Sequence, residues 1–85
     1  MIGGHIGNVF VYLKSDKSKS FKLKSTVFIY NYPINEELTY IKSLKQYFPE
    51  FETIKFDYEI YYNEMVIYVD NQEDFELIKS KYEWK

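Results

Sequence analysis

The 85-residue sequence contains no cysteine, no arginine and no alanine, and only one histidine, His5. Without cysteine the chain has neither a disulfide nor a thiolate metal site, so its stability must come from packing. Any zinc site or serine–histidine pair would depend on His5, which lies in a glycine-rich opening stretch. A solvated side chain is the usual state of such a histidine. We therefore expect a non-catalytic protein with no metal and no cofactor.

Long apolar runs are also missing. The longest, Val9–Leu13 and Met65–Val69, are far shorter than the roughly 20 residues of a membrane-spanning helix. No basic segment followed by a long apolar one opens the chain, so we expect no secretion signal. The length suits one domain, residues 1–85. A single-domain cytoplasmic protein without membrane contact is the expectation.

The charge is divided unevenly along the chain. Residues 1–32 carry five lysines and one acid, a net charge of +4, whereas residues 33–85 carry six lysines and twelve acids, a net charge of −6. This asymmetry indicates a charged partner. The lysine-rich, alanine-free composition is typical of AT-rich genomes. One hypothesis is therefore a phage- or mobile-element-encoded inhibitor that binds a host protein.

The residues from Thr53 to Asp70 have the alternation of a β-hairpin. Every second residue from Ile54 to Tyr62 is apolar. With Asn63-Glu64 as the turn, the cross-strand pairs on this apolar face are Tyr62–Met65, Ile60–Ile67 and Tyr58–Val69. Asp57 and Asp70 would then meet on the other face and, with Glu59, could hold a hard cation. Solvated carboxylates at strand ends are the more common arrangement.

The remaining elements follow from periodicity and from turn and cap residues. Strands are predicted over residues 6–14 and 21–32, joined by a polar hairpin loop at 15–20. A first helix begins after the N-cap Asn35 and ends at Pro49, and a second begins with Asp70 as its cap. Their apolar faces hold Tyr40, Ile41, Leu44, Tyr47 and Phe48 in the first helix, and Phe75, Ile78 and Tyr82, widened by Leu77 and Trp84, in the second.

The element order ββαββα predicts an α+β fold. We expect a four-stranded antiparallel sheet with both helices on one face. The order matches a ferredoxin-like chain with its last strand moved to the front, an analogy that carries no function. A duplicated ββα unit is an open alternative, because residues 27–30 and 36–43 can be laid on 65–68 and 73–80.

The second face of this sheet would be unusually aromatic for a solvated face. Its predicted side chains are Phe10, Tyr12, Phe28, Tyr30, Tyr61, Val66 and Tyr68. Apolar patches of this kind usually mark interaction surfaces, although tyrosine and phenylalanine are also common in ordinary strands. Our hypothesis is a small protein-interaction module that binds a protein partner, or a second copy of itself, through this face.

Single-stranded nucleic acid is the alternative partner. Bases stack on aromatic side chains of open sheets, and nearby lysines contact phosphates. The candidate phosphate contacts, which could equally serve an acidic partner, are Lys17, Lys19, Lys22 and Lys24. The absence of arginine and the acidic total charge make nucleic acid the weaker alternative. We expect no small-molecule substrate.

Overall fold

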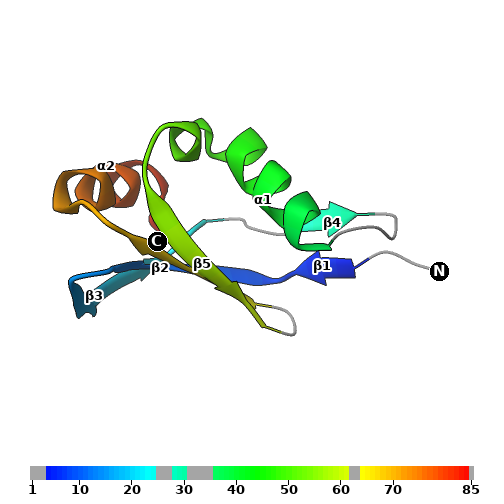
Figure 1. Cartoon of the computed structure of the whole chain (residues 1–85), viewed down its shortest axis with the longest axis horizontal. Coiled ribbons are helices and arrows are strands. Elements are labelled where there is room, and N and C mark those ends of the chain that lie inside the picture. The colour runs from blue at the N-terminus through cyan, green and yellow to red at the C-terminus, as the bar shows by residue number, and fades with distance from the viewer. Residues whose placement is uncertain (1–3, 25–27, 31–35, 62–63, 85) are drawn as a thin grey trace.

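The computed structural model describes residues 4–24, 28–30, 36–61 and 64–84 (Figure 1). Its strands are β1 (Gly4–Ile6), β2 (Asn8–Leu13), β3 (Asp16–Lys22), β4 (Phe28–Tyr30), β5 (Phe56–Ile60) and β6 (Glu64–Val69). Its helices are α1 (Glu36–Tyr47), the 3-10 helix η1 (Pro49–Glu52) and α2 (Gln72–Tyr82). The predicted cap Asn35 lies outside the described residues.

Four strands form a sheet in the order β3-β2-β6-β5, and both α-helices lie on one side of it (Figure 1). The α+β class and the two-helix layer are confirmed. The predicted antiparallel sheet is wrong at its centre, because β2 and β6 run parallel and make the sheet mixed. The strand beside β6 is β2, the first strand of the N-terminal hairpin. The element order remains compatible with a permuted ferredoxin-like chain.

The predicted strand at 21–32 is divided between two sheets. β3 already begins at Asp16, after a turn at Lys14 and Ser15, so most of the predicted loop at 15–20 is an exposed, lysine-bearing edge strand. β4 instead pairs with β1 in a separate two-stranded sheet. The proposed duplication aligns residues 27–30 with 65–68. Because β4 lies outside the main sheet and β6 lies at its centre, the strand pairing gives the duplication no support.

The hairpin of β5 and β6 has the predicted faces but a different register. Ile60 pairs with Met65 and Tyr58 with Ile67, so each partner is two residues from the predicted one. Side chains alternate between faces with a period of two, so a shift of two leaves every residue on its predicted face. The predicted pair Tyr62–Met65 involves a residue outside the described part of the chain.

The core lies between the sheet and the helices. Its strand side chains are Val9, Val11, Leu13, Phe21, Met65, Ile67 and Val69, and Leu23 follows directly after β3. Its helix side chains include Tyr40, Leu44, Phe75 and Ile78. Phe21 and Phe75 meet edge to face, with ring centroids 5.3 Å apart. Tyr47, Leu77 and Trp84, predicted on the helix core faces, are instead exposed.

Pro49 ends α1 as predicted and also starts η1. This 3-10 turn places Phe51 in the core with 1% of its surface exposed. Phe48 and Phe56 contact it edge to face, with centroids 6.5 and 5.2 Å away. Sequence periodicity gave no position to Phe51, because a single 3-10 turn is too short to show one.

Asn71 caps α2, correcting the prediction of Asp70. Its side-chain oxygen accepts hydrogen bonds from the amides of Glu73 at 2.7 Å and Asp74 at 3.3 Å. We expect Asn71→Ala to lower the free energy of unfolding by about 1 kcal/mol, because those amides lose their acceptor. Urea unfolding measures this loss. Gln72→Ala, one residue along, is the control, and equal effects of the two substitutions would contradict the assigned cap.

Candidate functional site

The face of the sheet turned away from both helices is the candidate site, and we call it the open face. Alternation along the strands directs to it the residues between the buried ones. At its centre lie four partly buried side chains from the two middle strands: Phe10, Tyr12, Val66 and Tyr68. The parallel register sets Phe10 beside Val66 and Tyr12 beside Tyr68. The rings of Tyr12 and Tyr68 are tilted by 34°, with centroids 5.8 Å apart.

The β3 side of the open face is basic. The ammonium of Lys17 lies 4.7 Å from the centroid of the Tyr68 ring, and that of Lys22 lies 4.7 Å from the centroid of the Trp84 ring. Both are cation–π contacts. The backbone amide of Trp84 donates to the Lys22 carbonyl at 2.7 Å, so the residues after α2 extend the β3 edge. The sequence assigned Trp84 to a helix face, since a strand-like extension after a helix leaves no periodic pattern.

The β5 side is acidic. One carboxylate oxygen of Glu59 accepts hydrogen bonds from the hydroxyls of Tyr61 at 2.7 Å and Tyr68 at 3.0 Å. These hydrogen bonds lower the pKa of Glu59, and the bond from Tyr61 has the larger effect. They also raise the pKa of both tyrosines. Glu59 therefore stays ionised at neutral pH and fixes two aromatic side chains beside it.

A cluster of ion pairs lies at the end of the sheet that holds Asp57 and Asp70, the two carboxylates of the predicted cation site. The ammonium of Lys14 lies 2.6 Å from Asp57 and 3.5 Å from Asp70, and that of Lys55 lies 3.7 Å from Asp70. The contact with Asp57 raises the pKa of Lys14 and lowers that of Asp57. Lys14 thus takes the position between the carboxylates that a cation would need. Over the part of the chain described, no group of three or more histidine or acidic side chains is placed to hold a metal.

The structure brings together some of the predicted site residues and separates others. Phe10, Tyr12, Val66 and Tyr68 share the open face, and the exposed Tyr61 joins them through Glu59. Phe28 and Tyr30 belong to β4, so their assignment to this face is wrong. The lysines divide likewise. Lys17 and Lys22 lie over aromatic rings at the open face, while Lys19 is an exposed residue of the same strand.

Lys24 lies elsewhere, at an open pocket between the end of α1 and the end of α2. The pocket has a volume of about 220 Å³ and is lined by Lys24, Tyr47, Phe48 and Tyr82. The amide of Lys24 donates to the Tyr82 carbonyl at 2.9 Å, which anchors the strand extension to the end of α2.

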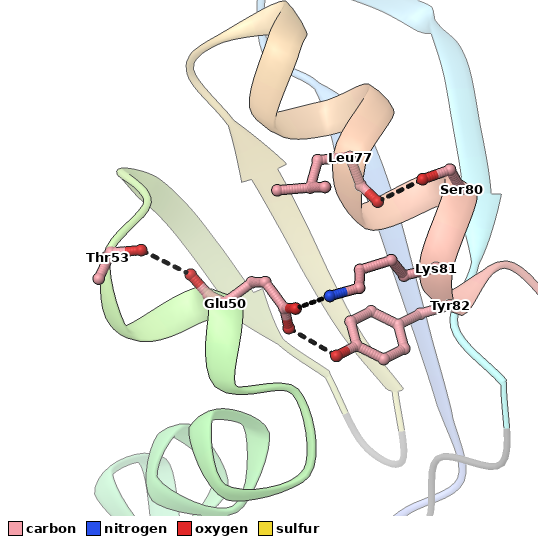
Figure 2. Close-up of polar contacts among 6 residues, drawn as sticks. All are labelled: Glu50, Thr53, Leu77, Ser80, Lys81 and Tyr82. Carbon is pink, nitrogen blue, oxygen red and sulfur yellow. Dashed lines mark hydrogen bonds and ion pairs between the residues drawn. The ribbon is translucent and has the colours of Figure 1, made fainter.

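A second polar cluster joins η1 to α2 beside this pocket (Figure 2). Glu50 accepts hydrogen bonds from the Lys81 ammonium and the Tyr82 hydroxyl, each at 2.5 Å. The hydrogen bonds from Lys81, which has the larger effect, and from Tyr82 lower the pKa of Glu50 to about 2. The Glu50 carboxylate in turn raises the pKa of Tyr82 to about 12. With every group so paired, the cluster serves as a structural link between the two elements.

Comparison with protein-family models, with curated proteins and with solved structures finds no match. Among the helices in the described residues, none has the length and apolarity needed to cross a bilayer.

Proposed function

We propose that this chain is a small non-catalytic protein-interaction domain and that the open face is its binding surface. The supporting observation is the position of Phe10, Tyr12, Val66 and Tyr68, which lie side by side on the face away from the helices. Apolar and aromatic groups at the centre of a face, with charges around them, are typical of protein interfaces.

The charges around this apolar centre indicate which charges the partner surface should carry. Lys17 and Lys22 lie toward β3, and Asp57 and Glu59 lie on β5. A complementary surface has an apolar centre, an acidic margin opposite β3 and a basic margin opposite β5. Nucleic acid fits less well, because the acids of β5 repel phosphates. We also propose that the protein acts inside the cell, which the absence of cysteine from the sequence supports.

Site-specific photocrosslinking tests the proposal. A benzophenone side chain at position 10 lies on the open face, and the same group at the exposed position 77 of α2 is the matched control. Irradiation of the purified chain, alone and in extracts of its own cells, is expected to give discrete protein adducts from position 10 only. Equal yields at both positions, or position-10 adducts that nuclease removes, would contradict a protein-binding face.

A further inference from the structure

Four side chains form a single row across the open face. Lys22 of β3 pairs with Phe10, Phe10 lies level with Val66 in the parallel pair, and Val66 pairs with Glu59 of β5. The row therefore has an ammonium at one end, two apolar groups in its middle and a carboxylate at the other end.

Within the part of the chain that the structure describes, neither the Lys22 ammonium nor the Glu59 carboxylate has an opposite charge in direct contact. The Lys22 ammonium contacts the ring of Trp84, and the Glu59 carboxylate accepts from tyrosine hydroxyls. The four ion pairs found within residues 4–24, 28–30, 36–61 and 64–84 all involve other groups. An interface that supplies opposite charges to both ends would gain from each.

The open face itself has the chemistry that its partner needs. Consider two copies that meet face to face and are related by a two-fold axis parallel to the strands. This axis reverses the order of the strands in the second copy, and the row of one copy lies directly over the same row of the other. Lys22 of one copy then lies opposite Glu59 of the other, twice, and Phe10 lies opposite Val66. An axis across the strands would instead set Lys22 against Lys22 and Glu59 against Glu59.

We infer, on the basis of the proposed function, that the partner is a second copy of this chain, related by a two-fold axis parallel to β2 and β6. Tyr12 of each copy packs on Tyr68 of the other beside the central row. Aligned sheets cross at about 30°, which displaces the row ends by about 4 Å. The long side chains of Lys22 and Glu59 span that displacement.

Pairing through the outer edge of β5 fits less well. Two β5 strands related by a two-fold axis would bring Asp57 and Glu59 of both copies to one seam, where like charges across a strand pair destabilise it. The open face is also small, about 14 Å across four strands and about 20 Å along them. We therefore expect a dimer that dissociates in the micromolar range or above.

Charge reversal at the row ends tests this geometry. Light scattering after size exclusion, over loading concentrations from about 5 μM to 1 mM, gives the dissociation constants. Lys22→Glu and Glu59→Lys are each expected to weaken the homodimer at least tenfold, because each sets like charges against one another twice. An equimolar mixture of the two variants restores association to within about threefold of the original chain, as does the double variant.

Lys42→Glu on α1 and Glu76→Lys on α2 are the matched controls, since both positions are exposed on helices away from the open face. Thermal melts establish that all variants fold. Restored association in the mixture supports the two-fold arrangement. A dimer that Tyr12→Ser weakens but charge reversal does not would overturn the axis and leave the proposed function standing. A monomer at every concentration whose position-10 adducts contain another protein would overturn self-association alone.

Discussion

Phe51→Ala is expected to lower the free energy of unfolding by about 3–5 kcal/mol, the range seen when a buried phenylalanine is truncated. Phe51 is 1% exposed and is enclosed by the Phe48 and Phe56 rings. Phe51 lies in η1, a single 3-10 turn. We expect the surrounding structure to relax only partly into the cavity that the substitution leaves. Such a loss is a large part of the stability of a domain this small. Urea or thermal unfolding followed by circular dichroism measures it.

Leu77→Ala is the control for Phe51→Ala. Leu77 is 44% exposed on α2, and alanine is a good helix former, so this truncation is expected to change stability by less than about 1 kcal/mol. If both variants lost equal stability, Phe51 would have no special place in the core.

Glu50→Gln is expected to cost about 1–2 kcal/mol at neutral pH, because the charged acceptor of Lys81 and Tyr82 becomes neutral. The pKa of Glu50 lies at about 2 in the folded chain, below its ordinary 4.5. A lowered pKa contributes stability that is complete above 4.5 and is lost as the pH falls through 2. The difference between the original chain and the variant should therefore shrink over that interval.

The alkaline side behaves in the opposite sense through Tyr82. Its pKa is raised from 10 to about 12, so its contribution is complete below pH 10 and is lost as the pH rises through 12. Thermal midpoints from pH 2 to 12 for the original chain, Glu50→Gln and Tyr82→Phe measure both sides. Glu52→Gln, an exposed change in the same 3-10 helix, is the control. A pH-independent difference between Glu50→Gln and the original chain would contradict the assigned cluster.

The alternation of strand side chains was enough to predict which residues enter the core. Alternation sets Val9, Val11 and Leu13 on the face opposite the predicted Phe10 and Tyr12, and all three are buried. Met65, Ile67 and Val69, predicted on the apolar face of the central hairpin, are buried too. The period of two depends only on backbone geometry, so it survives errors in register. The central hairpin shows this directly, since its register differs by two residues and its faces do not change.

Strand neighbours and turns were harder to predict, because they depend on contacts between distant residues. The residues Asp16–Ser20 are polar and favour a loop locally, yet they form an edge strand beside β2. The local pattern of Phe28 and Tyr30 matches that of a strand in the main sheet, yet their strand pairs with β1. Parity was therefore enough to place Phe10, Tyr12, Val66 and Tyr68 on the open face, whereas the place of Phe28 and Tyr30 depended on strand pairing.

The parallel pairing of β2 with β6 has a consequence for how the chain folds. Asn8 is aligned with Glu64 and Leu13 with Val69, so the two middle strands are separated by about fifty residues of sequence. Loop closure over that distance must precede the contacts that reward it. The two hairpins can form early and locally, whereas the sheet joins only after the second has been synthesised. The apolar strand β2 is therefore synthesised well before β6, the strand with which it pairs. We expect the folding rate of this domain to depend mainly on formation of this long-range strand pair.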